Sequence, residues 1–338
     1  MTKAAVKKND SMADIAAALR EAGSILLFPH ILMDGDAIGS AAALCLSLRA
    51  AGHESWVVIE DQIAANLAFL AHGTCLRVEE AAKRFPHGAD LSLCIDCGEE
   101  SRFPARQELY RAGRRSVCLD HHPTSAGIAD LNYIDPAAAA TGEIVYDLLT
   151  AGGLPLDRTT AGCLFAAIAT DTGNFTYSNT TSRSHEITVA LMDCGIDVNA
   201  ICVQLYESIP LAKLRLEAAV FAELELIADG RAAIAAVTRE MLQRCGARME
   251  DTDGLVERMR SLRGVQIAVL LKEVDAECIK AAMRAKTHGD VAAIACRHGG
   301  GGHVKAAGCT LHDNLAAVRS LLGREVEEAL AGAPEDGD

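Results

Sequence analysis

The chain has 338 residues, of which 50% are hydrophobic and 4% aromatic, and its formal net charge is −14. This length favours two domains over one core. The acidic balance argues against a protein that tracks along a nucleic acid duplex, because such proteins present a basic surface to the phosphates. An acidic chain can still act on an anion where metal ions reverse the local field.

The twelve cysteines are spaced irregularly along the chain. This pattern is untypical of a disulfide framework and favours a reducing compartment. Cys94 and Cys97 form a Cys-x-x-Cys pair that could bind zinc or act in redox chemistry, but no second pair accompanies it, so structural thiols are the preferred interpretation. No apolar run approaches the ~18 residues of a membrane span, and the N-terminus lacks a signal-like apolar region. We expect a cytoplasmic protein.

In the first half of the chain, short apolar strands alternate with helical patterns. The predicted strands are 24–28, 55–59, 91–95 and 116–119. The predicted helices are 14–22, 39–51, 62–71, 106–112, 142–151 and 160–170. This alternation is typical of a doubly wound parallel sheet in an α/β fold. Ligands of such sheets bind beyond the carboxyl ends of the strands.

The second half of the chain predicts a smaller α/β domain. Its predicted strands are 232–237, 265–274, 279–286 and 305–311, and its predicted helices are 252–262, 291–297 and 315–331. A long helical pattern over 198–226 is expected to link the halves. We predict a first domain over 1–200, a helical linker over 201–226 and a second domain over 227–332, with a cleft between the domains. Residues 1–10 and 333–338 are expected to be frayed or disordered.

Acidic residues and histidines follow the apolar segments of the first domain at four places. Each could be a turn or a helix cap when taken alone. Gly39 and Ser40 are expected to open a helix whose N-terminus would favour an anion. The candidates are His30, Asp34 and Asp36 after the first strand, Asp96 after the third, Asp120, His121 and His122 after the fourth, and Asp171 after a helix.

Taken together, these side chains predict a dinuclear metal site. Carboxylate oxygens suit hard divalent cations, and imidazoles shift the preference toward Mn²⁺ or another transition metal. Without a metal, the gathered carboxylates would repel one another. Two ions ~3.5–4 Å apart can clamp the oxygens of a phosphoryl group, so hydrolysis of a phosphate ester is the favoured chemistry. The predicted metal ligands are His30, Asp34, Asp36, Asp96, His121 and Asp171.

A run of four glycines, Gly299 to Gly302, precedes His303 in the second domain. Glycines let backbone amides approach an anion closely, although a flexible hinge is the alternative interpretation. Arg284 and Lys286, on the preceding predicted strand, are candidate phosphate contacts or ordinary charges at a strand edge.

The motifs HILMDGDAIGS, LCIDCG, LDHH and ATDTGNF resemble those of the DHH phosphoesterase superfamily, and GGGHVKAAG resembles the signature of its associated C-terminal domain. This superfamily includes RecJ-like exonucleases, family II inorganic pyrophosphatases and oligoribonuclease/pAp phosphatases. The resemblance covers about residues 20–330, and it matches the oligoribonuclease/pAp phosphatase branch best. Two positions depart from the common pattern: Ala285 replaces a frequent Ser, and Asn174 stands where many members carry Arg.

The resemblance also implies roles for individual residues. One Mn²⁺ would be held by His30, Asp34 and Asp96, and a second by Asp36, Asp96, His121 and Asp171. His122 would face the phosphate and stabilise charge or protonate the leaving oxygen, while Asp120 orients the imidazoles. The implied substrate contacts are Asn174, Arg284, Lys286, Gly300, Gly301, Gly302 and His303.

The resulting hypothesis is a manganese-dependent phosphodiesterase that cleaves short single-stranded oligoribonucleotides or linear dinucleotides to mononucleotides, and that also removes the 3′-phosphate of pAp. Hydrolysis of cyclic dinucleotides is an open alternative. The glycine run argues against an inorganic pyrophosphatase, and the complete ligand set argues against a catalytically silent nucleotide-binding regulator. Long duplexes and membranes are not expected partners, and family analogy suggests a homodimer.

Overall fold

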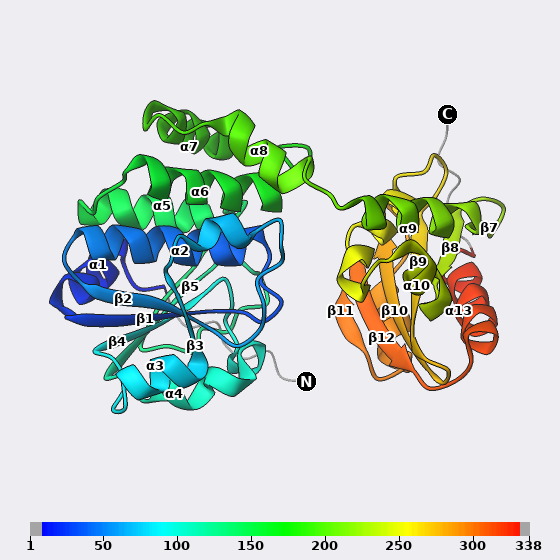
Figure 1. Ribbon diagram of the computed structural model, residues 1–338, viewed down its shortest axis with the longest axis horizontal. Helices are drawn as coiled ribbons and strands as arrows, with labels where there is room; N and C mark the ends of the chain where they lie inside the picture. The colour runs from blue at the N-terminus through cyan, green and yellow to red at the C-terminus, as the bar shows by residue number, and fades with distance from the viewer. Residues whose placement is uncertain (1–8, 332–338) are drawn as a thin grey trace. The chain divides into compact units, whose positions relative to one another are not determined.

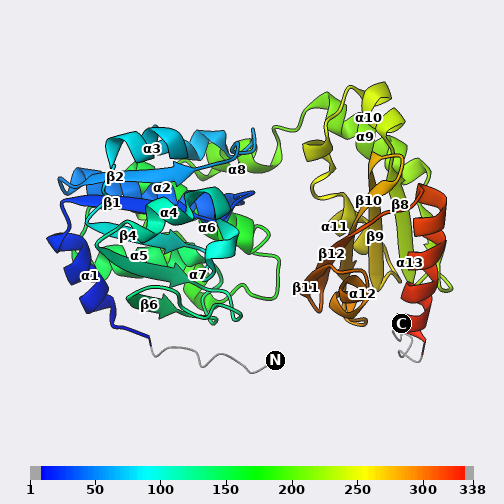
Figure 2. The same cartoon turned by 90° about the horizontal axis from the view of Figure 1, so that it is seen from below.

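The computed structural model describes residues 9–331, and the expectations for residues 1–8 and 332–338 lie outside that range. The chain divides into two compact units between Ser208 and Ile209. Each unit contains one six-stranded sheet. Helices cover the sheet of each unit, as Figures 1 and 2 show.

The sheet of the first unit is parallel throughout. Its strands are β1 (Ser24–Pro29), β2 (Glu54–Ile59), β3 (Cys75–Arg77), β4 (Leu91–Ile95), β5 (Arg115–Asp120) and β6 (Leu131–Ile134). Their order is β3-β2-β1-β4-β5-β6, so the direction of winding reverses between β1 and β4. This reversal confirms the predicted doubly wound sheet and opens a crevice at the carboxyl ends of these two strands.

Helices cover both faces of this sheet (Figure 1). On one face lie α1 (Met12–Glu21), α2 (Gly35–Ala50), α5 (Thr141–Gly152) and α6 (Arg158–Asp171), and on the other lie α3 (Val78–Arg84) and α4 (Gln107–Arg111). Two further helices, α7 (Ser182–Asp193) and α8 (Val198–Tyr206), pack outside α6. Residues 25–28 of β1 are all fully buried, because the two faces bury alternate side chains. The sequence of a strand that is buried on both faces is therefore continuously apolar.

The second unit is a mixed sheet in the order β11-β12-β10-β9-β8-β7. Its strands are β7 (Glu225–Ile227), β8 (Ala232–Val237), β9 (Ile267–Asp275), β10 (Cys278–Ala285), β11 (Gly301–His303) and β12 (Ala306–Leu311). On one face pack α12 (Val291–Arg297) and α13 (Leu315–Leu330), and on the other α9 (Leu211–Ala222), α10 (Arg239–Cys245) and α11 (Leu255–Arg260). The predicted second α/β fold is confirmed.

Two predicted helices differ in kind from the structure, and others differ only in their bounds. Residues 62–71 hold only a short 3₁₀ turn, Ala68–Ala71, in which tight backbone turns place Leu67 and Leu70 in the core. The pattern over 198–226 is two helices instead of one, since Pro210 lies between α8 and α9 and lacks the N–H that a helix interior needs. The first of these helices packs on α6 and the second on α10. Within residues 9–331, no helix combines the length and apolar character of a bilayer span.

Candidate metal centre

Three neighbouring strands of the first unit end at the same level. Pro29 pairs with Ile95, and Ile95 pairs with Leu119, so the residues that follow them come side by side. His30 and Asp96 follow β1 and β4 directly, and Asp120 ends β5. The crevice at the switch point is therefore lined by an imidazole and two carboxylates, with His121 and His122 following immediately.

The helices α2 and α6 supply further carboxylates to the site. Asp34 caps the N-terminus of α2, Asp36 lies in its first turn, and Asp171 is the last residue of α6. A Cβ on Gly35 would lie 2.3 Å from Thr170 Oγ1, and one on Gly39 would lie 2.6 Å from the Cys163 carbonyl oxygen. These glycines allow the two helices to pack closely, and this packing brings Asp36 to Asp171.

The expectation that Gly39 and Ser40 open a helix is wrong. The helix begins at Gly35, because Asp34 Oδ1 accepts a hydrogen bond from the Ala37 amide and supplies the cap one turn earlier. Gly39 serves helix packing, and Ser40 donates its hydroxyl to Asp36 Oδ1 at 2.9 Å. The sequence pattern singled out Gly39, but the role it predicted for this residue, that of opening the helix, was wrong.

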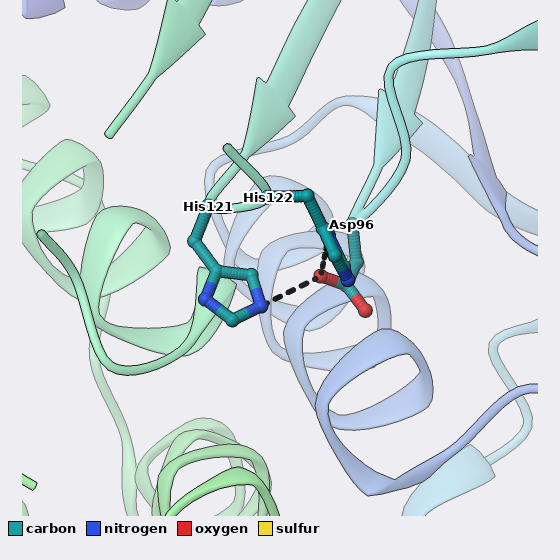
Figure 3. Close-up of side chains that lie close together, drawn as sticks. All are labelled: Asp96, His121 and His122. Atoms are coloured by element: carbon teal, nitrogen blue, oxygen red, sulfur yellow. Dashed lines mark ion pairs between the residues drawn. The ribbon is translucent and has the colours of Figure 1, made fainter. Parts of the chain in front are cut away.

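Asp96 stands at the centre of the cluster, with each carboxylate oxygen facing a different imidazole. Oδ2 lies 3.4 Å from His30 Nε2, and Oδ1 lies 3.6 Å from His121 Nε2. Figure 3 shows the second contact and the approach of His122 to the same carboxylate. Asp96 is 2% exposed and has a φ of 59°. A left-handed conformation at a buried acid is a strained arrangement of the kind found at functional sites.

The cluster contains three overlapping groups of donors that could hold a metal ion. The first is His30, Asp34 and Asp96, whose candidate ligand atoms lie within 4.8 Å of one another. In the second, His121 Nε2 is 3.8 Å from Asp36 Oδ2 and 3.7 Å from Asp171 Oδ2. The structure thus gathers all six residues that were predicted as metal ligands. Asp96 meets the second group through His121 Nε2, and a third group of donors within 4.8 Å of one another consists of Asp96, His121 and His122.

Backbone contacts orient the imidazoles of both groups. His30 Nδ1 lies 2.7 Å from the Ile31 carbonyl oxygen, and His121 Nδ1 lies 3.2 Å from the Ala138 carbonyl oxygen. Each contact favours the tautomer in which Nδ1 carries the proton and Nε2 holds a free lone pair. Both free nitrogens face the carboxylates, as metal-ligating histidines require.

The electrostatics of the cluster also fit a bound cation. Burial together with the charges of Asp96, Asp171 and Asp34 raises the pKa of Asp36 well above its usual value. Burial and neighbouring acids likewise raise the pKa of Asp171 to about 6, against the opposing effect of His121. These shifts express the cost of placing several carboxylates together out of water, and a divalent cation would remove that cost.

His30 carries the opposite shift. Burial by itself lowers its pKa, but hydrogen bonds and ion pairs with Asp34 and Asp96 raise it to about 10. In the metal-free protein, a proton on His30 therefore takes the place that a cation would hold. The donor chemistry, the orientation and the electrostatics together fit a divalent metal centre.

His122 has a different environment from the other imidazoles. Its Nδ1 lies 2.7 Å from Asp120 Oδ1, which also accepts the His122 backbone amide at 3.1 Å. The hydrogen bond with Asp120 raises the pKa of His122, and the side chain is 38% exposed. Although His122 Nδ1 is also 3.6 Å from Asp96 Oδ1, its engagement with Asp120 leaves Nε2 as the nitrogen that can meet a substrate.

Sequence reasoning missed Thr141, which holds two of the candidate ligands in place. Its backbone amide donates to Asp36 Oδ2 at 2.7 Å, and its hydroxyl donates to Asp96 Oδ1 at 2.8 Å. The next amide, of Gly142, donates to Asp36 Oδ1 at 2.9 Å. The N-terminus of α5 thus supports a buried carboxylate. A threonine at a predicted helix start was the available signal, but nothing in the sequence linked it to residues so far upstream.

The predicted substrate contacts lie partly outside this cluster. Asn174 is exposed, with a φ of 56°, in the turn that closes α6. Arg284 lies on β10 and pairs through Nε with Glu257 Oε1 at 2.9 Å, and Lys286 follows the strand and donates to the Leu262 carbonyl at 3.0 Å. The last two belong to the second unit, as does the glycine run.

Half of the glycine run, Gly301 and Gly302, is strand. Gly301–His303 forms β11 and pairs antiparallel with β12. A Cβ on Gly300 would lie 2.2 Å from the Gly308 carbonyl oxygen, and one on Gly302 would lie 2.4 Å from the Ala306 carbonyl oxygen. Close approach of two backbones thus accounts for Gly300 and Gly302. A Cβ on Gly301 would meet no atom within 4 Å, and His303 is exposed.

Comparison with known proteins agrees with this organisation. Residues 24–168 match the family model described as "DHH family, N-terminal domain", and residues 230–331 match the DHHA1 domain. The fold and the site define a metal-dependent phosphoesterase with a second α/β unit. The chain belongs to the DHH family.

The curated relatives extend over most of the chain. A protein of Thermus thermophilus named bifunctional oligoribonuclease and PAP phosphatase NrnA is 31% identical over 290 residues, which cover 86% of this chain and 84% of the relative. The Bacillus subtilis protein of the same name is 27% identical, covering 89% of this chain and 94% of the relative.

Solved structures show the same fold. A crystal structure of an exopolyphosphatase-related protein from Bacteroides fragilis has a TM-score of 0.88 at 24% identity, covering 95% of this chain and 97% of that one. RecJ from Thermus thermophilus has a TM-score of 0.58 at 14% identity, covering 99% of this chain and 56% of that one.

Proposed function

We propose that this protein is a phosphodiesterase that hydrolyses short single-stranded oligoribonucleotides or linear dinucleotides to mononucleotides, and that it also removes the 3′-phosphate of pAp. The observation that carries the proposal is the pair of donor groups that share Asp96. The names and the near full-length coverage of the relatives from Thermus thermophilus and Bacillus subtilis support the substrate class.

The proposed cofactor is a pair of Mn²⁺ ions. His30, Asp34 and Asp96 would hold one, and Asp36, Asp96, His121 and Asp171 the other. The mixture of imidazole and carboxylate donors favours Mn²⁺ over Mg²⁺, which prefers oxygen ligands alone. When bound, two such ions supply Lewis-acid stabilisation of the phosphoryl oxygens and activation of the attacking water.

The remaining steps fall to the side chains of the protein. Asp120 holds Nδ1 of His122, so Nε2 points outward and can donate a proton to the oxygen that leaves phosphorus. The raised pKa of His122 favours the protonated form that this step needs. The oxygen of the attacking water forms a new P–O bond and releases its proton to solvent, while the P–O bond to the leaving oxygen breaks. The freed hydroxyl keeps the proton from His122, and the exposed imidazole regains one from solvent. Thr141 keeps Asp36 and Asp96 in position throughout.

The accompanying assignments are also proposals. Asn174, Arg284, Lys286, the glycines 300–302 and His303 are proposed to contact substrate, and the net charge of −14 argues against long duplexes. The proposed compartment is the cytoplasm, supported by twelve free cysteines. A homodimer rests on family resemblance alone, and light scattering of the purified protein would test it.

A substrate panel in Mn²⁺, with products separated by chromatography, tests the function. Mononucleotides are expected from a linear dinucleotide, and AMP and inorganic phosphate from pAp. Exclusive turnover of a cyclic dinucleotide would replace this proposal with the alternative phosphodiesterase, and exclusive turnover of pyrophosphate would make the protein a pyrophosphatase. Absence of turnover on every substrate, with metal bound, would indicate a silent nucleotide-binding protein and contradict the proposal.

A further inference from the structure

Part of the second sheet carries basic side chains on a face that no helix covers completely. Along β10 the odd-numbered residues from Ile279 to Ala285 are buried in the core beneath α12 and α13. The even-numbered residues therefore share the opposite face. Over β8 and β9 that face is buried by α9, α10 and α11. Over β10 and β12 it stays accessible, since Lys280 and its cross-strand partner Thr310 are exposed.

Two lysines lie directly opposite each other on this face. Lys280 of β10 pairs in register with Lys272 of β9. Like charges in directly opposed positions destabilise a sheet. The side chain of Lys272 is only 20% exposed, so solvent screens its charge weakly. Burial lowers the pKa of Lys272, and the charges of Arg284 and Lys280 act in the same direction, against the opposing effect of Asp253 and Glu257. A sheet that retains such a pair bears an electrostatic cost that an anion between the two ammonium groups would remove.

The acidic residues nearby compensate these charges unevenly. Arg284 is held by Glu257 at 2.9 Å, so much of its charge is already neutralised. Lys272 meets Asp253 only at 3.9 Å, and Asp253 is 80% exposed. Within the described residues, Lys280 has neither an ion pair nor a side-chain hydrogen bond. The uncompensated positive charge on this face therefore lies mainly on Lys280, with a smaller part on Lys272, in a chain whose net charge is −14.

Both lysines line one cavity of about 440 Å³. The cavity is also lined by Gly300 and Gly308, and a side chain would not fit at Gly300, where a Cβ would lie 2.2 Å from the Gly308 carbonyl oxygen. Small residues, among them Ala282, Gly300 and Gly308, line the cavity together with the two lysines. A volume of this size suits a phosphate together with part of a nucleotide.

We propose that Lys272 and Lys280 form a phosphate-binding site in the second unit, which takes a phosphate of a nucleotide other than the one that is hydrolysed. The inference rests on the proposed function and deepens it by naming the preferred substrate: a short oligonucleotide with a terminal phosphate. Two ammonium groups around one phosphate give charge-assisted hydrogen bonds that a substrate without this phosphate cannot make.

The test compares two dinucleotides that differ in one group, adenylyl-adenosine with and without a 5′-phosphate. The variants are Lys280→Glu, Lys272→Gln, and Lys83→Glu as a control. Lys83 lies exposed on α3 in the other unit, so its substitution makes the same change in net charge as Lys280→Glu. Because Lys280 is exposed, its substitution should leave folding intact, which circular dichroism verifies.

For the wild-type protein we expect a lower KM for the phosphorylated dinucleotide. Lys280→Glu should raise that KM about tenfold, leave the KM for the unphosphorylated dinucleotide unchanged, and make the salt dependence of the apparent affinity shallower by about one phosphate contact. Lys272→Gln should also raise the KM for the phosphorylated dinucleotide, and Lys83→Glu should alter the KM for neither dinucleotide. Equal effects on both dinucleotides, or no effect on either, would overturn the inference.

A binding experiment distinguishes the failure of this inference from the failure of the proposed function. Equilibrium dialysis in chelator measures binding of both dinucleotides without turnover. If the wild-type protein cleaves neither dinucleotide but binds the phosphorylated one in preference, and Lys280→Glu removes the preference, the proposed function fails and the phosphate site stands. A wild type that shows no such preference overturns the site. Inorganic phosphate should compete more weakly than AMP; equal competition would assign the pocket to free phosphate.

Discussion

The Asp96 carboxylate lies 3.4 Å from His30 Nε2 through one oxygen and 3.6 Å from His121 Nε2 through the other. This arrangement joins the two donor groups, so the loss of this one carboxylate should disrupt both. We expect Asp96→Asn to reduce turnover of a dinucleotide at least 10³-fold and to lower the bound metal measured by atomic emission. Asp193→Asn, an exposed change on α7, is the control. Full metal content in the Asp96 variant would contradict a shared ligand.

His122 is proposed to act on the substrate and not on the metals. His122→Asn should lower kcat by about 10²–10⁴-fold, the usual contribution of a general acid, while metal content stays near that of the wild type. His121→Asn should instead reduce metal content as well as kcat. The exposed His87 provides a matched His→Asn control. A loss of metal in the His122 variant equal to that in the His121 variant would make His122 a ligand.

Asp120 is proposed as the positioning residue for His122. Because Asp120 raises the pKa of His122, Asp120→Asn should lower that pKa, so the alkaline limb of the profile of kcat against pH should move to lower pH. A purely structural role for Asp120 would lower the amplitude of the profile without shifting this limb. The measurement is kcat at saturating dinucleotide between pH 6 and 9.

Metal binding should compete with protons. With a pKa of about 10, His30 is protonated in the metal-free protein at neutral pH, and a ligating imidazole must be neutral. A raised pKa favours the metal-free form at low pH, so the affinity for Mn²⁺ should increase as the pH rises. Between pH 6 and 8 we expect about tenfold per pH unit for each proton released. Calorimetry in two buffers of different ionisation enthalpy counts the protons, and an affinity that does not vary with pH would contradict this assignment.

Gly39 should be intolerant of a side chain, because its Cβ would meet the Cys163 carbonyl oxygen at 2.6 Å. Gly39→Ala should therefore destabilise the protein by about 1–3 kcal/mol despite the better helix propensity of alanine, and it should reduce turnover by moving α2 from α6. Gly162→Ala on α6 is the matched control, since its Cβ would meet Ile201 Cδ1 at 3.4 Å, an ordinary contact. Thermal unfolding gives the melting temperatures of both variants. Equal melting temperatures would show that α2 and α6 shift apart at little cost and accommodate the added methyl group.

The sequence by itself determined the chemistry and the class of fold. Apolar runs followed by His30, Asp96 and Asp120 predicted strands with polar ends, since a strand buried on both faces has to be continuously apolar. The motifs identified all six candidate metal ligands, because residue type and short spacing are local properties. Local patterns were less informative for residues 62–71, where core packing selected tight turns over a helix.

Only the tertiary structure decided how these residues act together. The register of β1, β4 and β5 aligns His30 with Asp96, and close packing of α2 on α6 brings Asp36 to Asp171. The support that Thr141 gives to two buried carboxylates, and the opposition of Lys272 and Lys280, depend on strand pairing and on helix placement. Such contacts join residues distant along the chain, so their distances and burial arise only when the chain folds.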